Sequence, residues 1–261
     1  MIKFFRKIRQ SLLSENKFSK YLIYAVGEIV LVVIGILIAL QINNWNGNKA
    51  AQARIDSRII NLTKDIESDI TEMDEILQVA KDRIIVVKSI LEGSNRLGSF
   101  GISEGSTSLS NFEAFKEPTF ESTLENYENP NSKLSLLRTL DGNGPTYNEL
   151  INSGEFHLIK DRLLAKKIQN YYFNIAETKD RESINNKPSN VDIYKSKNRL
   201  GLGTHSKEGT MEKLIEMAKN DHQFGAELEH RYIMDVAQYN NTLKLKLQAL
   251  DLREAIKSTE R

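Results

Sequence analysis

The stretch YLIYAVGEIVLVVIGILIALQI, Tyr21–Ile42, decides the architecture of this chain. Between Ile29 and Leu40 it contains no polar side chain. A helix needs about 20 apolar residues to cross the hydrocarbon core of a bilayer, so this stretch is long enough. We therefore predict a transmembrane helix over residues 21–44. It follows a basic tail of residues 1–20 and precedes a polar domain of residues 45–261.

Charge on either side of the span predicts its orientation. The first 20 residues contain six Lys or Arg residues and one acid, Glu15. Cytoplasmic flanks carry an excess of Lys and Arg, so we expect the N-terminus inside, the span in the inner membrane and the large domain in the periplasm. The tail is either an amphipathic helix on the inner leaflet or a flank that only sets topology. We expect a retained signal anchor, because no small-x-small cleavage pattern lies near Ala39.

Composition narrows the classes of function. A formal net charge of +1 disfavours a general nucleic-acid binder, which would carry a strong basic excess. Without cysteine the chain has no disulfide, no thiolate metal site and no cysteine nucleophile. Four prolines and long periodic stretches predict an all-α fold, in which one transmembrane helix precedes an elongated extracytoplasmic helical bundle.

A narrow apolar seam follows the span. From Asn48 to Glu92 the apolar residues alternate between spacings of three and four, which predicts one long helix. Only Gly47 interrupts the join to the span, so the two helices can be continuous. Such a seam fits a coiled coil between chains or the first helix of an intramolecular bundle.

Five further helices are predicted. They cover Lys133–Leu140, Pro145–Ser153, Asp161–Asn186, Thr210–Lys219 and Asp221–Lys257, with a weaker helical pattern over Phe112–Tyr127. We expect loops at Gly93–Ser110 and Val191–Gly209, and Pro188 is expected to end a helix. The first and last long helices should pack antiparallel, with a shared core of Ile66, Met73, Leu77, Leu228, Tyr239 and Leu243.

Two stretches resemble a known group of proteins. One is MIKFFRKIRQSLLSENKFSKYLIYAVGEIVLVVIGILIALQINNWN at the start, and the other is TYNELINSGEFHLIKDRLLAKKIQNYY, Thr146–Tyr172. Together they resemble an uncharacterised family of small single-pass membrane proteins from Bacteroidota. Where that family has a Leu-Arg pair this chain has Leu163-Leu164, so no role of an arginine is carried over. The resemblance implies a location, a topology and helical content, with no catalytic residue.

Two local patterns suggest chemistry, but their context favours other interpretations. Gly101–Gly105 reads G-x-S-x-G, yet it lies in a Gly/Ser-rich loop without the preceding strand that a nucleophile needs. Glu227 and His230 have the spacing of a di-metal helix bundle, but a single copy of the motif occurs. We therefore assign no catalytic, cofactor-binding or metal-binding residue and expect no cofactor.

Two groups of residues are candidates for contact surfaces. In the soluble domain, Tyr147, Ser153, Gly154, Tyr171 and Tyr172 fit either core packing around a capped turn or a surface for a ligand or partner.

In the span, Tyr24, Glu28, Gly35 and Ala39 fall on one side of the helix, and Gly35 with Ala39 would let a second helix approach closely. Alternatively, Glu28 reaches the inner headgroups or is protonated.

These patterns predict a single-pass inner-membrane protein with a non-enzymatic periplasmic interaction module, acting as a scaffold or as a relay of an envelope signal. The expected partners are membrane lipid and either another protein or a second copy of the chain, with no nucleic acid. The alternative is a periplasmic ligand-sensing domain that acts through a membrane partner, and a membrane-anchored hydrolase comes third.

Overall fold

The computed structural model describes residues 18–97, 115–120, 129–142, 144–204 and 206–259. Within these ranges all regular elements are helical and no strand occurs, which confirms the all-α prediction. The chain divides into two compact units, Met1–Ser57 and Arg58–Arg261. The motif Gly101–Gly105 and most of the predicted loop around it lie outside the described residues.

The apolar span and the seam lie on one helix. Helix α2 runs from Phe18 to Gly93, 76 residues without a break at Gly47. Among the described residues it is the one helix long and apolar enough to cross a membrane, and its apolar window is not buried within the protein. The predicted continuity of the two segments is therefore confirmed.

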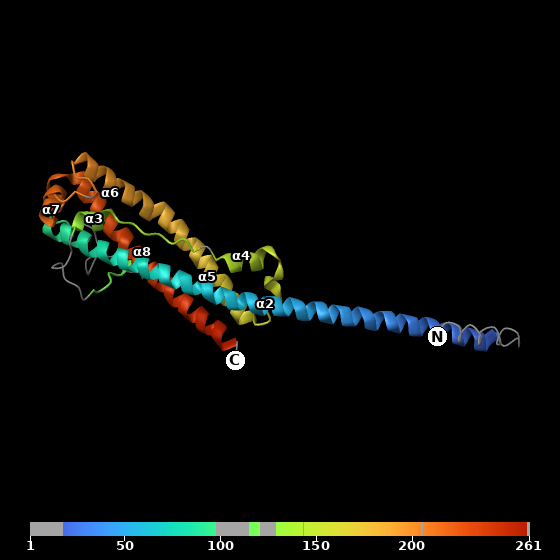
Figure 1. Cartoon of the computed structure of the whole chain (residues 1–261). Helices are drawn as coiled ribbons and strands as arrows, with labels where there is room; N and C mark the ends of the chain where they lie inside the picture. Colours follow the sequence, from blue (N-terminus) through green and yellow to red (C-terminus); the bar gives the residue numbers. More distant parts are fainter. Residues whose placement is uncertain (1–17, 98–114, 121–128, 143, 205, 260–261) are drawn as a thin grey trace. The chain divides into compact units, whose positions relative to one another are not determined.

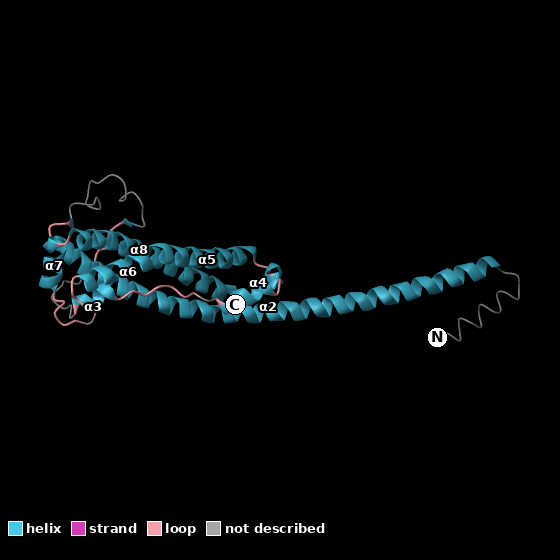
Figure 2. Cartoon of the chain, turned by 90° about the horizontal axis from the view of Figure 1, so that it is seen from above, coloured by secondary structure: helices cyan, strands magenta, loops and turns pink. Residues whose placement is uncertain are grey.

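The second unit is built from three helical segments that lie side by side (Figures 1 and 2). They are residues 58–93 of α2, the succession α5 (Arg162–Arg181), η5 (Glu182–Asn186) and α6 (Lys187–Arg199), and α8 (His222–Thr259). Helices α2 and α8 run antiparallel. Their ion pairs join Glu67 to Lys257, Asp74 to Lys246 and Arg83 to Asp235, at distances of 3.8, 2.5 and 2.7 Å. The seam of α2 thus packs within the chain.

One core cluster joins α2, α6, α7 (Met211–Asn220) and α8. Of the predicted shared core, Ile66, Met73 and Leu228 are fully buried, and Leu77 and Tyr239 are partly buried.

Leu243 is exposed, so its assignment to the core is wrong. The last turns of α8 carry two apolar stripes, and the stripe that enters the core contains Leu245, Ala249, Leu252 and Ile256.

Pro188 does not end the third long helix. The chain passes through a π-helical turn, η5, and continues as α6 to Arg199, so the predicted loop over residues 191–199 is wrong. Pro188 lies just after the π turn, within a backbone that stays helical from α5 through η5 into α6. The local change from α to π hydrogen bonding and the proline therefore occur at the same place in the helix.

The predicted helix Lys133–Leu140 is also misplaced. Helix α3 covers Pro130–Ser135, and the chain beyond it is extended. Buried side chains of the bundle bind this extended backbone, since Arg83 donates to the Leu136 carbonyl and Glu182 accepts from the Leu140 N–H, both at 2.8 Å. These bonds replace the helical bonds that the sequence pattern predicts. The described part of the weaker helical pattern, Phe115–Phe120, is not α-helical.

The helix caps agree with the sequence. Asp161 accepts from the backbone N–H groups of Leu163 and Leu164, and Thr210 accepts from that of Lys213. Asp221 accepts from the Phe224 N–H at 2.8 Å, at the start of α8. Each side chain satisfies a donor that the first helical turn leaves open.

Replacing Gly144 by alanine is expected to cost about 1–3 kcal/mol of stability. Gly144 precedes α4 (Pro145–Asn152) with φ +44°, and an added Cβ would lie 2.3 Å from the Tyr172 ring. Gly154→Ala is the matched control, because Gly154 has φ +67° but no atom within 4 Å of its added Cβ. Urea denaturation should give the larger loss for Gly144→Ala, and equal losses would exclude the Tyr172 contact as the cause.

Candidate functional site

The three tyrosines of the candidate surface come together. Tyr171 and Tyr172 are buried on α5, and Tyr147 of α4 stacks on Tyr172 with centroids 4.2 Å apart and an interplanar angle of 9°. Ser153 and Gly154 are exposed on the turn that follows α4. There the Ser153 hydroxyl accepts from Arg58 at 2.9 Å. The segment Thr146–Tyr172 therefore contributes an aromatic cluster between α4 and α5 and a polar turn at the surface.

A buried carboxylate of α2 completes this cluster. The Tyr171 hydroxyl donates to Asp69 at 2.9 Å. Burial raises the pKa of Asp69 to about 6, the hydrogen bond from Tyr171 opposes this shift, and the nearby acids Glu72 and Asp65 add to it. Sequence reasoning missed Asp69 because it is one of several acids between residues 65 and 75, most of which face solvent.

Asp69→Asn should remove a pH dependence of stability. A carboxyl whose pKa is raised in the folded state stabilises it below about pH 4, and this contribution is lost as pH rises through about 6. We expect the asparagine variant to exceed the parent chain by about 1–3 kcal/mol at pH 7 and to match it at pH 4. Urea denaturation at both pH values measures this difference. Asp74→Asn, at an exposed position of the same helix, should show no such difference between the two pH values.

The residues of the predicted contact face of the span are exposed or partly exposed where the structure describes them. Gly35 and Ala39 are exposed, Glu28 is partly exposed, and the side chain of Tyr24 lies outside the described part. A Cβ added at Gly35 meets no atom within 4 Å. The face remains a prediction.

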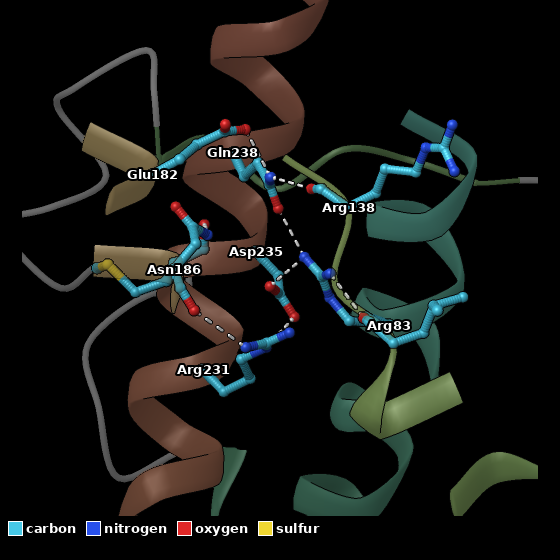
Figure 3. A network of polar contacts seen from close by, with 9 residues as sticks. Arg83, Arg138, Glu182, Asn186, Arg231, Asp235 and Gln238 are labelled. Carbon is cyan, nitrogen blue, oxygen red and sulfur yellow. Dashed lines mark hydrogen bonds and ion pairs between the residues drawn. The ribbon is translucent and has the colours of Figure 1, made fainter. Parts of the chain in front are cut away.

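The most unusual polar site lies inside the bundle, where an acid of α8 bridges two arginines (Figure 3). Asp235 accepts from Arg83 of α2 at 2.7 Å and from Arg231 of its own helix at 3.0 Å. Asp235 and Arg231 are completely buried, and the Arg83 side chain is 1% exposed. Arg231 also donates to the Asn186 carbonyl of η5 at 3.5 Å, so Arg83, Asp235 and Arg231 together link α2, α8 and η5.

A second layer of hydrogen bonds connects this ion triad, Arg83–Asp235–Arg231, to the π turn. The Gln238 amide oxygen accepts from Arg83 at 2.6 Å, and its nitrogen donates to Glu182 at 2.7 Å and to the Arg138 carbonyl at 2.9 Å. Burial raises the pKa of Glu182, although the bonds from Gln238 and from the Leu140 N–H oppose this shift. Through these bonds the network connects α2, η5, α8 and the extended backbone that follows α3.

The guanidinium groups are not fully satisfied. Arg83 Nε and Arg231 Nη2 are buried without a hydrogen-bond partner among the described residues. Burial lowers the pKa of Arg231 to about 10, while the charge of Asp235 opposes the shift. A buried ion pair is often no more stabilising than apolar residues of similar volume, but removal of one partner is strongly destabilising.

A second buried cation lies at the other end of α6. Lys197 is fully buried, and its ammonium donates to the Asn131 carbonyl of α3 at 3.0 Å and to the Ser135 hydroxyl. Burial lowers its pKa to about 8. This lysine fastens α3 to α6.

A cavity of about 270 Å³ opens beside the second layer. It lies between η5 and α8, and its wall includes Glu182, Asn186 and Gln238. Turns of π helix are frequent at functional sites because they displace side chains from the regular helical positions. Among the described residues no cluster of three or more His, Asp or Glu side chains is arranged to hold a metal ion.

Comparison with known proteins matches one part of the chain. The profile of a family of unknown function, DUF6090, matches residues 28–101. This agrees with the resemblance of the opening block to an uncharacterised family, and the second block, Thr146–Tyr172, lies outside the match. No curated protein matches the chain significantly, and no solved structure does.

Proposed function

We propose that this protein is a non-enzymatic interaction module, held to the inner membrane by α2 with its bundle in the periplasm, which scaffolds or relays an envelope signal through a protein partner. The observation that carries the proposal is that α2 is both the apolar span and a core helix of the bundle. In this proposal, a change in the bundle is passed along α2 to the span. The basic residues before the span support the orientation.

The charged groups of the bundle support a role without catalysis. Arg83, Arg231 and Asp235 are consumed in ion pairs and covered by neighbouring helices. A charged group that neighbouring helices cover cannot approach a substrate, whereas a catalytic acid or base must reach the reacting atom.

Exposed apolar side chains on α5 and η5 support the binding of a partner. Leu163, Phe173 and Ile184 are 77%, 63% and 73% exposed. Contiguous exposed apolar surface is typical of regions that associate, and crosslinking tests whether these side chains contribute to one. Phe173 is the strongest candidate, because aromatic residues are enriched where binding energy concentrates.

Site-specific photocrosslinking in native membranes tests this proposal. A photoreactive amino acid at Phe173 or Ile184 should give a discrete crosslinked species, and the same group at Lys195, an exposed polar position of α6, should not. Crosslinking at Lys195 alone, or at no position, would contradict the surface.

Topology is tested separately by alkaline phosphatase fused after Arg261. We expect the fusion to be active, because the enzyme folds only outside the cytoplasm, and an inactive but expressed fusion would reverse the orientation.

A further inference from the structure

The cavity beside the π turn has the chemistry of a small-molecule site. Its apolar wall contains Phe115, Met234 and Ala237, and its polar wall contains Glu182, Asn185 and Asn241. Its 270 Å³ equal the volume of about nine water molecules in the liquid. Apolar walls with a few convergent polar groups are typical of ligand pockets, and this volume suits a small ligand.

Glu182 gives the cavity its charge preference. It is 3% exposed, and its two oxygens accept from neutral donors, the Gln238 amide at 2.7 Å and the Leu140 N–H at 2.8 Å. Both arginines of the ion triad instead bind Asp235. A carboxylate oxygen can accept two hydrogen bonds, so each Glu182 oxygen retains capacity for a further donor. The charge of Lys187 also acts on Glu182, and a ligand cation would add a direct partner beside the two neutral donors.

The other lining groups are compatible with a cation. Arg181 also lines the cavity, but its guanidinium is more than half exposed and lies 3.6 Å from Glu177, so solvent and this acid reduce its field. The amide oxygens of Asn185 and Asn241 can accept the remaining N–H bonds of an ammonium group. The face of the Phe115 ring can contact a cation or an apolar body.

We propose that this cavity binds a small primary ammonium compound with an apolar body. The ammonium group pairs with Glu182, and the body packs against Phe115, Met234 and Ala237. Binding then bridges η5 and α8 and adds a contact to the layer that holds Arg83 of α2. This role goes beyond the proposed scaffold, because it requires no protein partner.

Thermal unfolding of the full chain in detergent tests the proposal and is followed by the circular dichroism of the helices. Three small molecules with a similar apolar body but different charge serve as probes. Phenethylamine carries the ammonium, phenethyl alcohol is its neutral analogue, and 3-phenylpropionate carries a negative charge. Phenethylamine at about five times its Kd should raise Tm by about 2–4 °C, and the other two probes should not. Equal shifts with all three probes, or no shift with phenethylamine, would overturn the proposal.

Variants separate binding in the cavity from partition into detergent. Glu182→Gln should abolish the shift, because it removes the charge at nearly the same size, while its one oxygen can replace only one of the two acceptors for Gln238 and Leu140. Ala237→Leu should also abolish it by filling the cavity while the carboxylate remains. Glu216→Gln, an exposed acid of α7, is the matched control and should keep the full shift. A shift that persists in both cavity variants would refute the site.

Discussion

Replacing Asp235 by alanine is expected to lower the free energy of unfolding by about 3–5 kcal/mol. The substitution leaves two buried guanidinium groups, those of Arg83 and Arg231, without their shared counter-charge. Each would have to be hydrated or become neutral, and both are expensive inside a helical bundle. The loss therefore comes from the cations left behind more than from the acid removed.

Urea denaturation of the full chain in detergent measures this loss. Asp251→Ala is the control, because Asp251 is also an acid of α8 in an ion pair, with Lys167, but is 65% exposed. We expect that control to change stability by less than about 1 kcal/mol. Replacing Arg83, Arg231 and Asp235 together by Met, Met and Leu should recover most of the stability. If Asp235→Ala and Asp251→Ala lower the free energy of unfolding by the same amount, then Asp235 does not stabilise the two buried arginines.

Phe224→Ala should cost about 3–5 kcal/mol, because it removes a ring that is 0% exposed at the junction of α2, α7 and α8. The cost combines lost apolar burial with the cavity left among neighbours such as Leu91 and Leu214. The loss should depend little on pH, because the substitution removes no titratable group.

Phe173→Ala provides the matched comparison for this ring, since Phe173 is 63% exposed on α5. It should leave the midpoint of urea denaturation nearly unchanged while weakening crosslinking to a partner. A large loss of stability in Phe173→Ala, or none in Phe224→Ala, would show that the burial of these rings is assigned incorrectly.

Periodicity predicts most of the helices because burial follows the helical repeat. Ile66, Met73 and Leu228 recur at core spacing, and each is buried. The same rule fails at Leu243, where two apolar stripes compete and only packing against α2 and α5 selects one. It also fails at Pro188, because a local rule for helix ends does not contain the π turn that precedes it.

The buried polar site could not be predicted from one sequence. Arg231 and Asp235 are four residues apart, which is also the spacing of an ordinary surface ion pair. In the sequence Arg231 directly precedes the core residue Tyr232, and Asp235 directly precedes the core residue Val236. This position beside core residues is the sequence signal that the two side chains face inward. Their third partner, Arg83, is distant in sequence, so only the fold reveals the triad.

The pairing of α2 with α8 also determines when the bundle can form during synthesis of the chain. Arg83 and Asp235 are separated by 152 residues. At about 5–20 residues per second, the ribosome needs about 8–30 s to make Asp235 after Arg83. During that interval the apolar seam of α2 has no α8 to cover it. Assembly of the bundle must therefore wait until α8 has been synthesised, and until then the uncovered seam is accessible to proteases and chaperones.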